Sequence, residues 1–132
     1  MRKLSGIRGR CEVLLTSPLT VLDVAHNADG VAAALAFARA HRPAGALHVL
    51  LGLMRDKDLA AVAAVLRRFQ ATVTPVHLNS PRALPVADLR SGLGGLALSP
   101  IDAPTAAPEA LAWLRQRCSP GDVVLAVGSH LV

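Results

Sequence analysis

The side chains best suited to chemistry gather in two short segments, the first of which is Asp23 followed by Ala25, His26 and Asn27. Asp23 ends an apolar run typical of a buried strand, and Asn27 opens a segment with helical spacing. Backbone N–H groups at the start of a helix favour an anion, and a histidine there can reach the same phosphate. The segment therefore predicts a nucleotide-facing loop. The alternative is that Asn27 only caps the helix and that Asp23 only bonds a neighbouring loop.

The second segment runs from Gly52 through Asp56, Lys57 and Asp58. Gly52 allows a sharp exit from the preceding apolar run, and Asp58 stands where an N-cap of the next helix is expected. Lys57 is harder to explain structurally, because a cation near a helix N-terminus is unfavourable unless an anion accompanies it. Lys57 is therefore a candidate catalytic residue, together with His26 from the first segment.

Two weaker candidates flank these segments. Arg10 follows Gly9 at the entrance to the first apolar run, where chemistry alone favours an ordinary turn with a solvated side chain. Ser129 follows the last apolar run, but no glycine stands two residues after it, so a nucleophile elbow is excluded. The 132 residues also contain no GxxxxGK[ST] loop and no GxGxxG after the first strand. The chain therefore predicts neither a triphosphate-binding P-loop of its own nor an independent dinucleotide-binding domain.

The elements that would position these residues alternate between strand and helix. Short apolar runs predict strands, and apolar residues at helical spacing predict helices. The predicted strands cover 11–16, 20–24, 47–51, 72–77, 96–98 and 123–127, and the predicted helices follow Asn27, Asp58, Pro85 and Thr105, with Thr105 as the N-cap of the last. This order implies a three-layer, Rossmann-like open α/β sheet, mainly parallel with one antiparallel edge strand. Ligands of such sheets bind at the carboxyl ends of the strands, which here lead into 25–29, 52–58, 77–85 and 128 onward.

Composition and charge exclude several classes of protein. A length of 132 residues suits one domain, and a hydrophobic fraction of 52% rules out intrinsic disorder. No apolar run approaches the ~20 residues of a membrane span. The net charge is +5, but Arg2, Lys3, Arg8 and Arg10 supply four of these charges, and the chain has no Tyr for stacking on bases. A nucleic-acid partner is therefore disfavoured.

Cysteine and histidine usage adds two expectations. Cys11 and Cys118 are far apart and form no CxxC motif, so we expect reduced core thiols of a cytoplasmic protein. The five histidines share no metal-ligand spacing with the cysteines or with one another. We therefore expect no metal site built within this chain alone.

Four motifs, taken together and in order, resemble one family. They are Gly9-Arg10-x-Glu12-x-Leu14, Leu22-Asp23-x-Ala25-His26-Asn27, Leu51-Gly52-x-x-x-Asp56-Lys57-Asp58 and Val127-Gly128-Ser129. This pattern is similar to the C-terminal domain of folylpolyglutamate synthase / dihydrofolate synthase, in the Mur ligase superfamily, and it spans about Gly9 to Ser129. The peptidoglycan Mur ligases, which carry variant signatures at the same loops, are the nearest alternative. The resemblance implies an interdomain linker or tail over 1–9 and a Mur ligase C-terminal-like domain over 10–132.

The resemblance also implies a function for a longer protein. An N-terminal P-loop ATPase domain would bind ATP, most of the Mg²⁺ ligands and a folate or dihydropteroate, and this domain would close over it. ATP would convert the substrate carboxylate to an acyl phosphate, and L-glutamate would then form the amide. Arg10, Asp23, His26 and Asn27 would contact the nucleotide, and Ser129 would contact the amino acid, with no metal ligand in this chain.

Three expectations complete this hypothesis. The isolated domain would be inactive, and the whole protein would be a cytoplasmic monomer that binds neither membrane nor nucleic acid. Whether it adds the first glutamate, later ones or both stays open, because the pterin pocket would lie in the other domain. The alternative from a different class is a non-catalytic α/β binding or interaction module derived from a Mur-type ligase.

Overall fold

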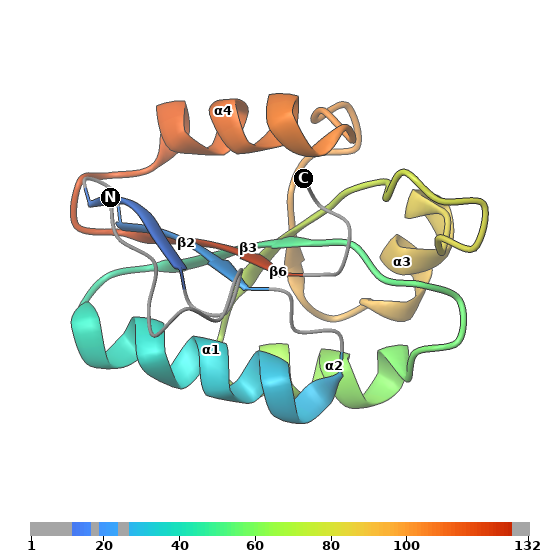
Figure 1. Cartoon of the computed structure of the whole chain (residues 1–132), viewed down its shortest axis with the longest axis horizontal. Coiled ribbons are helices and arrows are strands. Elements are labelled where there is room, and N and C mark those ends of the chain that lie inside the picture. Colours follow the sequence, from blue (N-terminus) through green and yellow to red (C-terminus); the bar gives the residue numbers. More distant parts are fainter. Residues whose placement is uncertain (1–11, 17–18, 24–26, 128–132) are drawn as a thin grey trace.

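The structure is a computed structural model that describes residues 12–16, 19–23 and 27–127 (Figure 1). Within these residues, six strands form one sheet in the order β1-β2-β6-β3-β4-β5. The strands are β1 (Glu12–Thr16), β2 (Leu19–Asp23), β3 (Leu47–Leu51), β4 (Thr72–Pro75), β5 (Ala97–Leu98) and β6 (Val123–Val127), and the helices are α1 (Ala28–His41), α2 (Leu59–Arg68), α3 (Val86–Gly92) and α4 (Ala107–Arg117).

The direction of the strands confirms the predicted fold class. β1 pairs with β2 in antiparallel fashion at one edge, whereas the pairings β2–β6, β6–β3, β3–β4 and β4–β5 are all parallel. Helices α1 and α2 cover one face of the sheet and α4 covers the other, so the domain has three layers (Figure 1). The domain is therefore an open, mainly parallel α/β sheet with an antiparallel edge strand, as expected.

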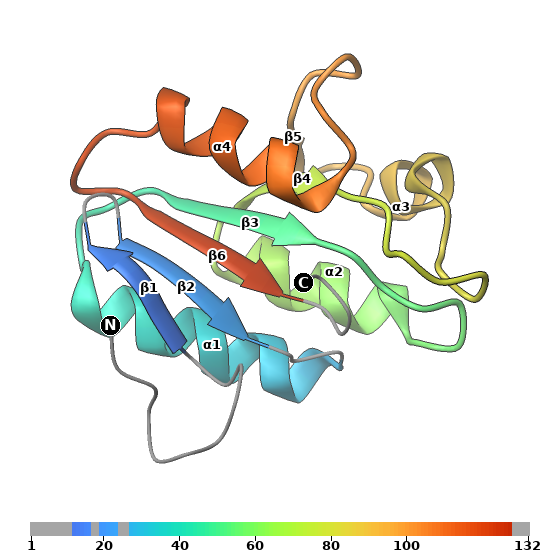
Figure 2. The ribbon, with the colours of Figure 1, turned by 45° about the horizontal axis from the view of Figure 1, so that its top comes forward.

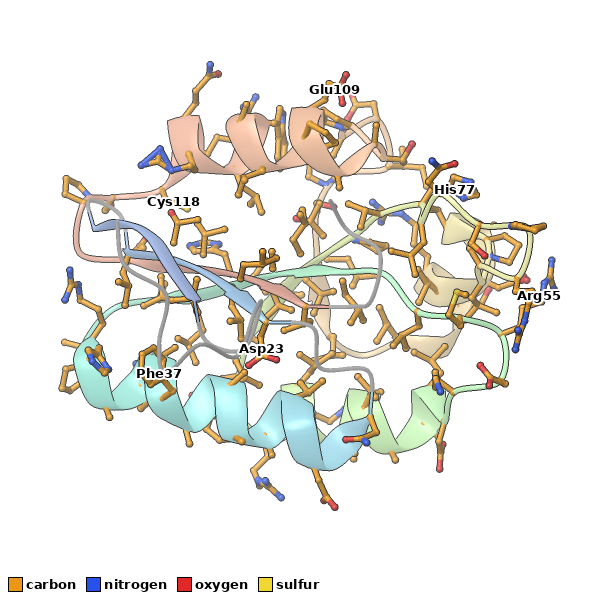
Figure 3. All side chains as sticks on the ribbon, viewed as in Figure 1. Asp23, Phe37, Arg55, His77, Glu109 and Cys118 are labelled. Atoms are coloured by element: carbon orange, nitrogen blue, oxygen red, sulfur yellow. The ribbon has the colours of Figure 1, made fainter. Side chains whose placement is uncertain are left out.

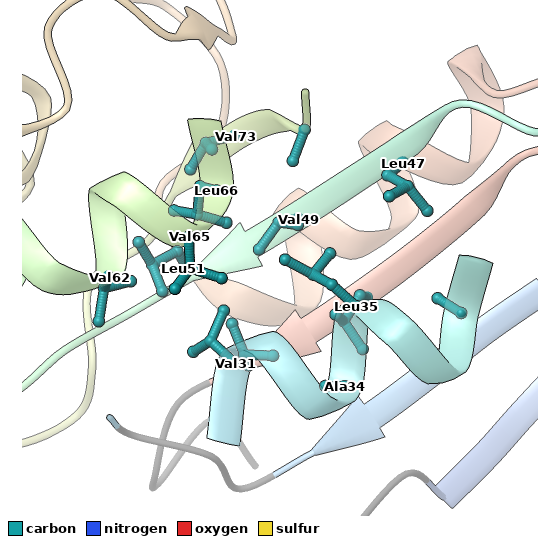
Figure 4. Packing of buried hydrophobic residues seen from close by; sticks show 14 of the residues in the cluster. Val31, Ala34, Leu35, Leu47, Val49, Leu51, Val62, Val65, Leu66 and Val73 are labelled. Carbon is teal, nitrogen blue, oxygen red and sulfur yellow. The ribbon is translucent and has the colours of Figure 1, made fainter. Parts of the chain in front are cut away.

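Burial on both faces explains why the central strands are continuous apolar runs. Side chains alternate along a strand, and in β3 Val49 and Leu51 pack toward α1 and α2, whereas Leu50 packs toward α4. In β6, Leu125 belongs to the first of these two clusters and Val124 to the second. Figure 4 shows the larger cluster, in which side chains of α1 and α2 meet those of β3.

The start of α4 differs from the sequence prediction. The N-cap is Ala106, and it has no side-chain cap hydrogen bond, so the expectation that Thr105 caps this helix is wrong. The carbonyl of Thr105 instead accepts a hydrogen bond from the backbone N–H of His77 at 2.8 Å. Thr105 thus links the residues just before α4 to the segment after β4. This long-range contact overrides the local preference of Thr105 for capping.

None of the helices in the described part of the chain combines the length and the apolar character that a membrane span requires.

Gly45 is required by a close approach between two backbones. A Cβ at this position would overlap the carbonyl oxygen of Gly121, in the turn before β6. A backbone oxygen cannot rotate away as a side chain can, so we expect Gly45→Ala to lower the free energy of unfolding by about 1–3 kcal/mol. Chemical denaturation followed by circular dichroism measures this. Gly121→Ala is the matched control, because a Cβ there has no atom within 4 Å; equal stability of the two variants would contradict the explanation.

Candidate active site at the carboxyl ends of the strands

Four neighbouring parallel strands end side by side at one edge of the sheet. The register pairs Asp23 with Val127, Val127 with Leu51, and Leu51 with Pro75. The segments that leave β2, β3, β4 and β6 must therefore begin next to one another, and Figure 2 shows the arrowheads of β2, β3 and β6 pointing the same way. This is the edge at which ligands bind in open parallel sheets.

Asp23 places a buried carboxylate at this edge. It is the last residue of β2, and only 5% of its surface is exposed. Leu19 and Val21 belong to the cluster on the α1 side of the sheet, so the alternation of side chains directs Asp23 toward the same face. Figure 3 labels Asp23 in the interior, near α1. Asp23 takes part in a hydrogen-bond or electrostatic interaction within the chain, as a carboxylate buried this deeply requires.

Asn27 is the N-cap of α1. Its Oδ1 accepts a hydrogen bond from the backbone N–H of Gly30 at 2.9 Å, so the structural alternative from the sequence analysis is present in the fold. The side chain of Asn27 is exposed, and its amide nitrogen remains a donor that capping does not use. Capping and contact with a nucleotide are therefore compatible. Arg10, His26 and Ser129, the other predicted contacts, lie outside the described residues.

Lys57 lies beside a carboxylate in the loop after β3. Its Nζ is 3.7 Å from Oδ2 of Asp56, and its side chain is 27% exposed. Asp58 caps α2, since its Oδ1 accepts from the backbone N–H of Ala61 at 3.1 Å, which confirms the sequence prediction. The anion that a cation at a helix N-terminus requires is thus supplied within the chain by Asp56.

Arg82 is a second cation at this place that sequence analysis missed. Its Nη2 lies 3.9 Å from the same Oδ2 of Asp56, although it belongs to the loop after β4. The two loops are tied by an antiparallel bridge between Met54 and Ala83, and the backbone N–H of Arg55 donates to the carbonyl of Arg82 at 2.8 Å. The loop 77–85 was expected at this edge, but no spacing in the sequence could show that Arg82 approaches Asp56.

Gly52 allows these two loops to approach each other. A Cβ at Gly52 would lie 2.5 Å from Cδ2 and 2.8 Å from Cγ of Leu78, which is fully buried. The loops 52–58 and 77–85 together carry three cations, Arg55, Lys57 and Arg82. They also carry two carboxylates, Asp56 and Asp58. The three cations outnumber the two carboxylates, which leaves these loops with a net positive charge. This surface can therefore attract an anionic group.

The capping role of Asp58 can be tested separately from the role of Lys57. Asp58→Ala is expected to lower the free energy of unfolding by about 1 kcal/mol, because the hydrogen bond to the N–H of Ala61 is lost. Asp58→Asn keeps a capping oxygen and is the matched control, with stability close to that of the unchanged chain. Urea denaturation measures both variants, and an equal loss in both would show that charge, not capping, is the contribution of Asp58.

Comparison with known proteins decides the family of this domain. A model of the Mur ligase glutamate ligase domain matches residues 9–130. The chain belongs to this family. No curated protein sequence matches the chain. The resemblance predicted from the four sequence motifs is thus confirmed, and this Mur ligase domain has the fold expected of it.

Solved structures of Mur ligase relatives agree with this assignment. Escherichia coli FolC in complex with DHPP and ADP has a TM-score of 0.80 and 24% identity, over 95% of this chain and 29% of that one. The Yersinia pestis bifunctional folylpolyglutamate synthase/dihydrofolate synthase with AMPPNP and Mn has a TM-score of 0.81 and 25% identity, over 96% and 30%. A bifunctional enzyme of the same name with Mn, AMPPNP and L-glutamate bound has a TM-score of 0.79 and 26% identity, over 96% and 30%. The chain therefore spans about 30% of the length of these enzymes.

Proposed function

We propose that this chain is the C-terminal domain of an ATP-dependent folate:L-glutamate ligase, which closes over ATP and helps to bind L-glutamate. The observation that carries the proposal is the buried carboxylate of Asp23, at the edge where four parallel strands end. Support comes from the family and from similar enzymes crystallised with ADP, with AMPPNP and Mn, and with L-glutamate. Those enzymes are about three times as long as this chain, which has no P-loop motif of its own.

The proposed reaction has two steps. The γ-phosphoryl group of ATP passes to the carboxylate of a folate or dihydropteroate, and ADP leaves. The amine of L-glutamate then attacks the carbonyl carbon of the acyl phosphate, the C–O bond to phosphate breaks, and an amide and inorganic phosphate result. Phosphoryl transfer depends mostly on positioning and on neutralising charge. A domain that closes over the P-loop partner supplies both and keeps water from the acyl phosphate.

The residues of this domain then have separate tasks. Asp23 accepts hydrogen bonds from the ribose hydroxyls, and Arg10 neutralises charge on the phosphates. His26 and Asn27 lie in the same loop and face the phosphates or the incoming glutamate, while Lys57 stabilises negative charge during transfer. Ser129, after the last strand, contacts the amino acid. These tasks rest on the resemblance of the motifs and on the shared edge of the sheet.

Mg²⁺ belongs to the P-loop domain in this proposal. Among the described carboxylates of the loop 52–58, Asp58 caps α2, and Asp56 is paired with Lys57 and Arg82. These residues are committed to other contacts and do not fit a magnesium site, so we derive no step through a metal held by this domain. The proposed enzyme is a monomer of the cytoplasm.

The test compares two proteins, one that joins this chain to its P-loop domain and the chain alone. The joined protein should release ADP and phosphate in equal amounts only when ATP, L-glutamate and a pteroate or folate are all present. The isolated chain should release none. Dihydropteroate and a folate monoglutamate, assayed separately, decide whether the first or later glutamates are added. Glutamate-independent ADP release, or no release by the folded joined protein, would instead support a non-catalytic module derived from a Mur-type ligase.

A further inference from the structure

Three side chains with metal-binding atoms meet at the amino ends of β3 and β6, at the opposite end of the strands from Asp23. His48 lies near the start of β3, Cys118 is the C-cap residue of α4, and Asp122 immediately precedes β6. His48 Nε2, Cys118 Sγ and a carboxylate oxygen of Asp122 all lie within 4.8 Å of one another. The three residues come from separate elements, so the fold, not a local sequence motif, brings them together.

The carboxylate of Asp122 is held in place by backbone donors. Its Oδ1 accepts from the N–H of Ala46 at 3.2 Å, and its Oδ2 accepts from the N–H of Ser119 at 3.1 Å. Burial alone would raise the pKa of Asp122, but these hydrogen bonds and the one from His48 outweigh it and lower the pKa below its usual range. A carboxylate held in place by backbone donors is already positioned to bind a metal ion.

The distances suit a tetrahedral metal ion. His48 Nε2 and Asp122 Oδ2 are 3.2 Å apart. In a tetrahedral zinc site with metal–ligand bonds of about 2.0–2.3 Å, neighbouring ligand atoms are about 3.3–3.6 Å apart. The nitrogen and oxygen are close to this separation. Coordination through Nε2 requires His48 to carry its ring proton on Nδ1, so the ion takes the place of the hydrogen bond between Nε2 and Oδ2. The Sγ of Cys118, at most 4.8 Å from the other two atoms, would have to move closer by roughly 1–1.5 Å.

Cys118 is free and half-buried, and it packs against the apolar cluster below α4; Figure 3 labels it near that helix. Burial raises the pKa of its thiol, the charge of Asp122 raises it further, and Arg115 acts in the opposite direction. Coordination of a metal ion would replace the thiol proton with the cation. The side chains of His48 and Asp122 are 20% and 19% exposed, so an ion in solvent can reach them.

We propose that His48, Cys118 and Asp122 bind a divalent transition-metal ion of the Zn²⁺ class, with water as the fourth ligand. A thiolate with an imidazole favours zinc-like ions over Mg²⁺, which prefers oxygen ligands alone. The site lies at the amino ends of β3 and β6, whereas the proposed nucleotide edge lies at their carboxyl ends. The proposal is therefore independent of the ligase function.

The test is a titration of the 132-residue chain with Co²⁺, which takes the place of Zn²⁺ and reports its ligands by absorption. We expect one equivalent to bind with a thiolate-to-cobalt charge-transfer band, and Zn²⁺ to displace it. Cys118→Ser should abolish the band, and His48→Gln should weaken binding by more than ~100-fold, since loss of a direct ligand costs more than loss of a supporting contact. His77→Gln, at an exposed histidine outside the cluster, should change nothing.

Two results would overturn the proposal. One is a folded chain that shows no thiolate band at saturating Co²⁺. The cluster would then have only a structural role, as a polar contact between α4, β3 and β6. The other is a band that persists in Cys118→Ser, which would assign the thiolate to Cys11. Circular dichroism of each variant confirms that it is folded, and Gln at position 48 keeps a donor for the carboxylate of Asp122.

Discussion

Asp23→Asn, introduced into the proposed full-length ligase, is expected to lower kcat/KM for ATP by about 100-fold, which corresponds to about 2.7 kcal/mol of transition-state stabilisation. The substitution keeps the size of the side chain and removes its charge. A carboxylate can accept from both ribose hydroxyls, whereas an amide offers one oxygen and places donors where acceptors are needed. Hydrogen bonds to an ionised group are also the stronger kind. Steady-state rates with ATP as the varied substrate measure the effect.

Asp88→Asn is the control for this prediction. Asp88 is an exposed carboxylate in the first turn of α3, which the proposed nucleotide contacts do not include, so its kinetics should match those of the unchanged enzyme. Arg10→Ala is expected to impair the use of ATP in the same way as Asp23→Asn, on the strength of the motif resemblance. Unchanged ATP kinetics in folded Asp23→Asn enzyme would remove this carboxylate from the site.

Leu35→Ala is expected to have the largest effect on stability, about 3–5 kcal/mol. Leu35 is fully buried in the cluster between α1, α2 and the sheet (Figure 4), so its removal costs the transfer energy of the side chain and leaves a cavity. A domain of this size has a free energy of unfolding of about 5–15 kcal/mol. This one substitution would therefore remove a large share of the free energy of unfolding, and a large part of the population could unfold.

Ile101→Ala is the matched control for Leu35→Ala. Ile101 is 81% exposed, and the same kind of truncation there should change stability by less than about 0.5 kcal/mol. Urea denaturation should show a lower midpoint for Leu35→Ala with an unchanged slope. Similar midpoints for the two variants would contradict the assignment of Leu35 to the core.

Most elements of the fold could be predicted because their signals are local. Continuous apolar runs marked the doubly covered strands, and Asn27 and Asp58 marked the starts of α1 and α2. The position of β6 could not be predicted in this way. β6 comes last of the strands in sequence yet lies between β2 and β3, and such a placement depends on long-range pairing that no short pattern encodes.

The same contrast between local signals and long-range contacts applies to the sites. Asp23 and Lys57 could be singled out because each belongs to a compact motif at the end of a strand. Arg82 was missed because its approach to Asp56 depends on the bridge between two loops. The cluster of His48, Cys118 and Asp122 was missed because His48 and Asp122 are 74 positions apart. A search by ligand spacing cannot find groups that only the folded sheet assembles.

The central place of β6 has a consequence for how the domain forms during synthesis. β2 and β3 do not pair with each other, because each pairs with β6. Until residues 123–127 have left the ribosome, β1–β2 and β3–β4–β5 are two parts of the sheet that do not pair with each other, and each has an unpaired edge open to other chains. The nascent domain is therefore most exposed to aggregation just before its last strand emerges, and holding that strand back would extend this interval.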